Sequence, residues 1–122
     1  MFTIAVEGSF SAVHRLVLAD GSSEPLHGHD WRVVVRLETA ELDKVGMVAD
    51  FADVRRGLEE ITAALNYSDL NQHEWFRGCN PTAEHVARVI FDRMAGHPEW
   101  GKLVTSVELA EAPGCVAGYC RP

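Results

Sequence analysis

The chain has 122 residues, of which 47% are hydrophobic and 24% are charged, as expected for one compact globular domain. Its formal net charge of −7 argues against a surface that binds nucleic acid by general electrostatic attraction. No apolar run approaches the length of a membrane-spanning helix, and the N-terminus has no positively charged leader. We therefore expect residues 1–122 to form a single cytoplasmic domain without nucleic-acid or membrane partners.

Two half-buried strands are predicted in the first third of the chain. Apolar residues alternate with small or polar ones from Phe2 to Phe10 and again from Trp31 to Thr39. The second strand runs directly out of His29, so a histidine-rich segment lies at its entrance.

Two helices follow, and two further strands end the chain. Asp50 can cap a helix whose apolar positions between Phe51 and Leu65 are spaced by three and four residues. Pro81 suits the first turn of a second helix, which extends to Gly96. The final strands are expected near residues 104–110 and 116–120. This order of elements predicts an α+β fold, in which two helices cover one face of a four-stranded antiparallel sheet.

The segment His27-Gly28-His29 indicates a metal site. In an extended strand, residues i and i+2 point to the same face with Cα atoms about 6.5 Å apart, so both imidazoles can reach one ion. His14, at the end of an apolar segment, is the best candidate for a third ligand, and three imidazoles leave one position of a tetrahedral zinc ion open. Two alternatives stay open: an incidental histidine pair with a buried core His14, and another first-row metal.

Several motifs in this chain resemble those of the 6-pyruvoyltetrahydropterin synthase and 6-carboxytetrahydropterin synthase family. The segments 10–14 and 27–29 resemble its two zinc-ligand motifs, and the segments 46–51 and 80–84 resemble those that open its two helices. The resemblance covers nearly the whole chain. It implies the tunnelling fold, or T-fold, in which small α+β subunits assemble into a homo-hexamer, a dimer of trimers, with active sites between subunits.

The resemblance also implies a chemistry. Members of this family act on the side chain of 7,8-dihydroneopterin triphosphate, and Zn2+ held by His14, His27 and His29 would polarise the side-chain oxygens. Glu111 matches the glutamate that anchors the pterin ring, and Thr82 is assigned to the substrate site with it. The expected protein is therefore a zinc-dependent lyase with a small-molecule pterin substrate.

One departure from the family pattern concerns the catalytic base. Ser23 occupies the position of the cysteine that the commonest members place four residues before the first histidine of His-x-His. A variant branch instead carries a glutamate three residues before that histidine, as Glu24 does here, and cleaves the side chain to give 6-hydroxymethyl-7,8-dihydropterin. A partly buried carboxylate near zinc can accept a proton, so Glu24 is the candidate base.

A second departure concerns the family's Asp-His pair, which is replaced by Asn66 and Tyr67. Asparagine cannot accept a proton, and a phenol with a pKa of about 10 is a better donor than base, so Tyr67 is a candidate donor. His73 and His85 can replace the pair only if folding or assembly brings them to the site. Two other functions therefore stay open: a pterin-binding paralogue without turnover, and an enzyme for a different pterin-like substrate.

Overall fold

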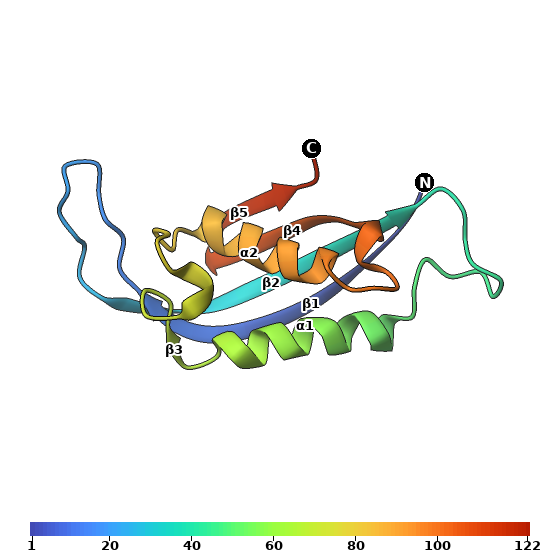
Figure 1. Ribbon diagram of the computed structural model, residues 1–122, viewed down its shortest axis with the longest axis horizontal. Coiled ribbons are helices and arrows are strands. Elements are labelled where there is room, and N and C mark those ends of the chain that lie inside the picture. The colour runs from blue at the N-terminus through green and yellow to red at the C-terminus, as the bar shows by residue number, and fades with distance from the viewer.

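The computed structural model describes all residues from 1 to 122, and its longest feature is an antiparallel hairpin. The strands β1 (Phe2–His14) and β2 (His27–Thr39) pair along their whole length, from Phe2 opposite Thr39 to His14 opposite His27. Residues 15–26 and 40–50 form long loops that project at opposite ends of the molecule (Figure 1).

The remaining elements complete one mixed sheet and its helical layer. The strand order is β3-β1-β2-β4-β5, in which β3 is parallel to β1 and the other neighbours are antiparallel. In chain order these elements are α1 (Phe51–Leu65), β3 (Ser68–Asp69), the 3-10 turn η1 (Glu74–Phe76), α2 (Ala83–Ala95), the 3-10 turn η2 (Gly101–Leu103), β4 (Val104–Ala112) and β5 (Cys115–Cys120).

Both helices begin at capped ends and pack on one face of the sheet. The Asp50 carboxylate accepts a hydrogen bond from an amide of α1, and the Thr82 hydroxyl accepts one from an amide of α2. In Figure 1, α1 runs along β1, whereas α2 lies over the side of the sheet that contains β4 and β5. The apolar stripes of both helices and the alternate residues of the strands form one core. Neither helix has the length and apolar character needed to cross a membrane.

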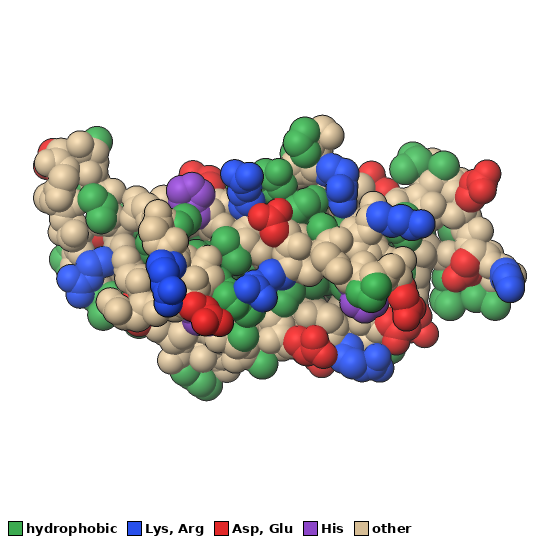
Figure 2. All heavy atoms as spheres, in the orientation of Figure 1, with side chains coloured by type: hydrophobic (Ala, Val, Ile, Leu, Met, Phe, Trp, Pro, Cys, Tyr) green, Lys and Arg blue, Asp and Glu red, His purple; other side chains and the backbone are tan.

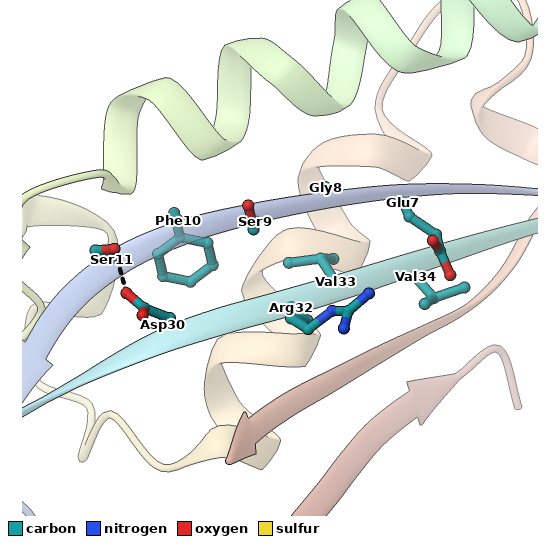
Figure 3. A pocket seen from close by; sticks show the side chains of 9 residues that line it. All are labelled: Glu7, Gly8, Ser9, Phe10, Ser11, Asp30, Arg32, Val33 and Val34. Atoms are coloured by element: carbon teal, nitrogen blue, oxygen red, sulfur yellow. Dashed lines mark hydrogen bonds between the residues drawn. The ribbon is translucent and has the colours of Figure 1, made fainter. Parts of the chain in front are cut away.

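The other face of the sheet carries polar side chains. Glu7, Ser11, Asp30 and Arg32 line a shallow pocket along β1 and β2 (Figure 3). Within it, Ser11 Oγ donates a hydrogen bond of 2.5 Å to the Asp30 carboxylate. Acidic and basic side chains are interspersed over the surface seen in Figure 2.

The α+β layers expected from the sequence are confirmed, and the sheet contains one strand more than expected. The extra strand, β3, has two residues and pairs with Ala12 and Val13 near the end of β1. β1 also extends to His14 instead of ending at Phe10, and β4 continues to Ala112 through a β-bulge. The two-residue strand depends on pairing with the distant β1, and the bulge depends on the register of the β4–β5 hairpin, so hydrophobic alternation reveals neither.

Candidate metal centre

Three histidines gather at one end of the β1–β2 hairpin because of its register. His14 lies directly opposite His27, and His29 follows two residues later on the same face of β2. The ring centroids are 4.7 Å apart for His14 and His27, 5.2 Å for His14 and His29, and 4.8 Å for His27 and His29. The structure therefore brings together the three residues that the sequence predicted as metal ligands.

Backbone carbonyls orient two of these rings. His14 Nδ1 lies 2.8 Å from the Pro81 carbonyl oxygen, and His27 Nδ1 lies 2.8 Å from the Pro25 carbonyl oxygen. A carbonyl can only accept a hydrogen bond, so each Nδ1 must carry a proton and each neutral ring has its lone pair on Nε2. Second contacts of this kind commonly fix the tautomer of metal-binding histidines.

Glu111 joins the histidines from β4, the strand that neighbours β2 in the sheet. Its Oε1 lies 2.9 Å from His14 Nε2 and 3.0 Å from His29 Nε2. β4 and β5 change register between the pairs Ala110–Val116 and Ala112–Cys115, so Glu111 is the extra residue of a β-bulge. Bulges commonly redirect a side chain next to a functional site. The sequence assigned Glu111 to the pterin ring, whereas the structure places its carboxylate at the histidines.

The donor atoms fit a metal ion. One donor atom from each of His14, His27, His29 and Glu111 lies within 4.8 Å of every other. Atoms bound at about 2.0–2.2 Å to a tetrahedral zinc ion are about 3.3–3.6 Å apart, somewhat longer than the 2.9 and 3.0 Å from Glu111 to two of the histidines. His14 Nε2 and His29 Nε2 are buried without a hydrogen-bond partner, since their short contacts with Glu111 lack hydrogen-bond geometry. A cation would satisfy these lone pairs.

Burial also keeps one of the rings in the form that binds metal. Desolvation lowers the pKa of His29 from its ordinary value of 6.5, and the neighbouring imidazoles lower it further, while the Glu111 carboxylate opposes the shift. A neutral imidazole is the form that binds a metal ion. His29 therefore loses its proton more readily than an exposed histidine does.

Trp31 supports the histidines from the core. Its ring is fully buried and lies edge to face with His14 at 4.9 Å and with His29 at 5.3 Å. Trp31 Nε1 donates a hydrogen bond of 3.2 Å to the Ala12 carbonyl oxygen, which fixes the ring in its plane. Sequence analysis placed Trp31 in a strand but did not identify this role, although its position two residues after His29 puts both side chains on one face.

Glu24 lies beside the third histidine. Its Oε1 is 3.6 Å from His27 Nε2 and accepts a hydrogen bond of 3.1 Å from the amide of Leu16. The amide of Glu24 donates to the Leu16 carbonyl oxygen at 3.0 Å, so backbone and side chain are both held. The loop acid singled out in the sequence is thus close to the metal centre.

Two asparagines from the second half of the chain fix the start of this loop. Asn71 accepts a hydrogen bond from the amide of Arg15 at 2.8 Å and donates one to its carbonyl oxygen at 2.9 Å. Asn80 makes the same pair of contacts with Val17, at 3.0 and 3.1 Å. Each asparagine side chain therefore pairs with the backbone N–H and C=O of one loop residue, as a neighbouring β-strand would. These asparagines lie within the motifs Leu70-Asn71 and Asn80-Pro81-Thr82, and sequence reasoning missed their role.

The segment in place of the Asp-His pair is held by β1. Asn66 Oδ1 accepts a hydrogen bond of 2.9 Å from the amide of Ser11, and the amide of Tyr67 donates to the Ser11 carbonyl oxygen at 2.6 Å. Tyr67 has a positive φ of 58°, and its side chain is 87% exposed. It lines a pocket of about 580 Å³ together with His29 and Asp30. Tyr67 is therefore at the rim of the site and does not pack in the core.

The two histidines considered as replacements for the Asp-His pair, His73 and His85, make hydrogen bonds away from the metal cluster. His73 accepts a hydrogen bond from the amide of Trp75 and lies 3.2 Å from the Ala64 carbonyl oxygen, and His85 Nδ1 lies 2.6 Å from the Asn80 carbonyl oxygen. Thr82, assigned to the substrate site, caps α2 next to the Pro81 carbonyl that orients His14. The structure brings neither His73 nor His85 into the metal cluster.

Comparisons with known proteins show which family and which solved structures this chain resembles. A putative 6-carboxy-5,6,7,8-tetrahydropterin synthase from Archaeoglobus fulgidus is 32% identical over 108 residues, which cover 88% of this chain and 86% of that protein. The structure of the Caenorhabditis elegans 6-pyruvoyl tetrahydropterin synthase superimposes with a TM-score of 0.88 at 24% identity, and the match covers 99% of this chain and 96% of the other.

A Plasmodium vivax 6-pyruvoyltetrahydropterin synthase, solved with a catalytic glutamate replaced by alanine, has a TM-score of 0.81 at 19% identity and covers 98% of this chain and 97% of its own. These structures confirm the T-fold that the motifs implied. The sequence itself matches the family description "6-pyruvoyl tetrahydropterin synthase" from residue 3 to residue 122. The chain therefore belongs to the 6-pyruvoyl tetrahydropterin synthase family.

Proposed function

We propose that this chain is a zinc-dependent lyase that cleaves the side chain of 7,8-dihydroneopterin triphosphate and forms 6-hydroxymethyl-7,8-dihydropterin. The observation that carries the proposal is the position of Glu24, whose carboxylate is 3.6 Å from His27 Nε2 at the edge of the histidine cluster. Family membership supports a pterin substrate, and the buried, unpartnered nitrogens of His14 and His29 support a metal.

The proposed reaction is a retro-aldol cleavage that begins at Glu24. Its carboxylate removes the proton from the hydroxyl on the second side-chain carbon, and that oxygen becomes the carbonyl of the aldehyde that leaves with the triphosphate. The bonding pair of the broken carbon–carbon bond passes to the carbon attached to the ring, which takes up a proton. His14, His27 and His29 would hold the zinc ion, which would supply electrostatic stabilisation of the developing oxyanion. No oxidant or reductant is needed.

Other residues of the site have proposed roles in binding and protonation. Tyr67 is the proposed donor to the ring-attached carbon, because its phenol is exposed at the rim of the pocket that His29 lines. Glu111 and Thr82 hold the ring, Glu111 through two hydrogen bonds from its amino-pyrimidine edge. The Leu16 amide bonded to Glu24 Oε1 fixes the base in place while leaving its second oxygen free.

We propose that the working form is a cytoplasmic homo-hexamer with sites between subunits. The outer edge of β5 has no neighbouring strand in the sheet, and an open edge of this kind favours pairing with another copy. Tyr67 at the pocket rim is far more exposed than a catalytic side chain in a closed site, which fits a site completed by a neighbouring subunit.

A second candidate function is pterin binding without turnover, or turnover of a different pterin-like substrate. The observation in its favour is that Asn66 replaces an ionisable residue and commits its side-chain oxygen to the amide of Ser11. In this case the metal and the ring site remain, whereas proton transfer is lost or altered.

The test is to incubate the zinc-loaded protein with 7,8-dihydroneopterin triphosphate and to identify the products by mass spectrometry. Glu24→Gln should abolish product formation and leave zinc and pterin binding intact, and His29→Ala serves as the control with an impaired metal site. Normal activity in Glu24→Gln would refute the assignment of the base. Binding of the pterin without any product would favour the second candidate.

A further inference from the structure

We infer that Glu111 is an exchangeable ligand: it occupies the fourth metal position in the resting site and leaves that position when the pterin ring arrives. Its Oε1 touches the metal-binding nitrogens of His14 and His29 at 2.9 and 3.0 Å. The same carboxylate is the proposed anchor of the ring, where its two oxygens accept the two hydrogen bonds from the amino-pyrimidine edge, so the oxygen that faces the histidines is needed for the ring as well. The ring-binding half of this inference rests on the proposed function.

The geometry argues that Glu111 is a ligand in the resting state. Two buried nitrogens without a hydrogen-bond partner and a carboxylate oxygen converge here, an arrangement that is repulsive unless a metal ion lies among them or an imidazole is protonated at Nε2. Glu24, the other carboxylate of the cluster, is already bonded to the Leu16 amide and is farther from its nearest imidazole nitrogen, at 3.6 Å. The two carboxylates therefore have different roles: Glu111 is the fourth metal ligand, and Glu24 remains available as a base.

The structure also provides the space for exchange. Glu111 lies on a β-bulge beside the turn at Pro113 and Gly114, where the pairing of β4 with β2 has already ended at Arg32–Ala110. The strands separate beyond that pair, and a pocket of about 700 Å³ there is lined by both His29 and Glu111. A carboxylate at this position can turn from the histidines into the pocket without disturbing the core. A ring bound in the pocket would then hold the carboxylate and leave the fourth position open to the substrate side chain.

The experiment uses Co2+ as a spectroscopic probe of the metal site in the full chain. Glu111→Gln is compared with Glu108→Gln, which removes one negative charge from the wall of the same pocket but lies outside the cluster. We expect Glu111→Gln to weaken Co2+ binding at least about tenfold and to change the visible absorption, and Glu108→Gln to change the affinity by no more than about twofold. Circular dichroism checks the fold, and Glu111→Asp, with a shorter carboxylate, should bind Co2+ with intermediate affinity.

Exchange is tested by adding pterin, which has the ring but no side chain that can reach the metal. In the wild-type protein pterin should change the Co2+ absorption, because the ring removes Glu111 from the ion, and in Glu111→Gln it should have no effect. Equal Co2+ affinity and spectra in the wild type and Glu111→Gln would overturn the ligand assignment. Pterin binding that is seen by fluorescence but leaves the wild-type Co2+ spectrum unchanged would overturn the exchange. Failure to bind pterin at all would contradict the proposed function and the exchange together, while the Co2+ affinities still decide whether Glu111 is a ligand.

Discussion

Replacing Asn80 by alanine should loosen the loop that carries Glu24 without touching the metal ligands. Asn80 makes two hydrogen bonds with the backbone of Val17, at 3.0 and 3.1 Å, and each neutral bond contributes about 0.5–1.5 kcal/mol to stability. Both bonds are exposed to solvent, so each contributes in the lower part of that range. We therefore expect Asn80→Ala to lower the free energy of unfolding by about 1–2 kcal/mol. The effect on turnover should be larger, because a catalytic group displaced by about 1 Å can cost about 100-fold in rate.

The assay measures three quantities for the same variant: urea unfolding, zinc content, and product formation from 7,8-dihydroneopterin triphosphate. Hydrogen exchange at the amides of Leu16, Val17 and Glu24 reports on the loop directly, whether or not the protein is active. Thr39→Ala is the matched control, because it also removes two hydrogen bonds, both with Glu41, at the far end of the hairpin. If Asn80→Ala leaves amide exchange and turnover at the level of Thr39→Ala, Asn80 does not position Glu24.

Three further predictions concern the core, a strained residue and pH. In Gly57→Ala the new Cβ would lie 2.9 Å from two ring atoms of Trp100, so overpacking of about 1–3 kcal/mol should exceed the gain of about 1 kcal/mol in helix propensity and lower the urea midpoint. Tyr67→Gly removes a positive φ of 58° that costs about 1–2 kcal/mol but adds about 0.4–1 kcal/mol of unfolded-state entropy, so the urea midpoint should rise slightly. Turnover should fall if the phenol is the proton donor. The lowered pKa of His29 contributes stability to the metal-free protein above pH 6.5, and this contribution is lost as the pH falls through the folded-state pKa. The free energy of unfolding in urea should therefore differ less between pH 7.5 and pH 5.5 in His29→Gln than in the wild type.

The sequence was a good guide wherever a periodic pattern was itself the signal. The alternation in β1 and β2, the helical spacing of α1 and the capping residue Asp50 each depend on neighbours close in the chain. The same reasoning placed His27 and His29 on one face and selected His14 as the third ligand, and the resemblance to a family agreed with His14 and with both helix starts. These local rules, together with the order of the elements, were enough for the α+β layers.

Contacts that depend on the three-dimensional fold could not be predicted from local sequence patterns. The Asn71 and Asn80 side chains bond to backbone segments 56 and 63 residues away, and nothing in their local pattern distinguishes them from turn asparagines. The bulge at Glu111 arises from the register of two strands, and it decides whether the carboxylate faces the histidines or the ring. The support from Trp31 likewise needs the histidines and the core to be placed together.

The two departures from the family pattern are explained together by the contacts of Asn66 and Glu24. Asn66 ends α1 and gives its side-chain oxygen to the amide of Ser11, so its position is used to attach the helix to β1 and offers no base. Glu24 and Glu111 are the carboxylates that lie within 4 Å of an imidazole nitrogen of the cluster, and Glu111 is occupied with two of the three rings. If the chain is an enzyme, proton removal therefore falls to Glu24. The serine at position 23, the glutamate at position 24 and the missing Asp-His pair then describe a single change, in which proton removal depends on the carboxylate at position 24 and no longer on a cysteine at position 23 and an Asp-His pair after α1.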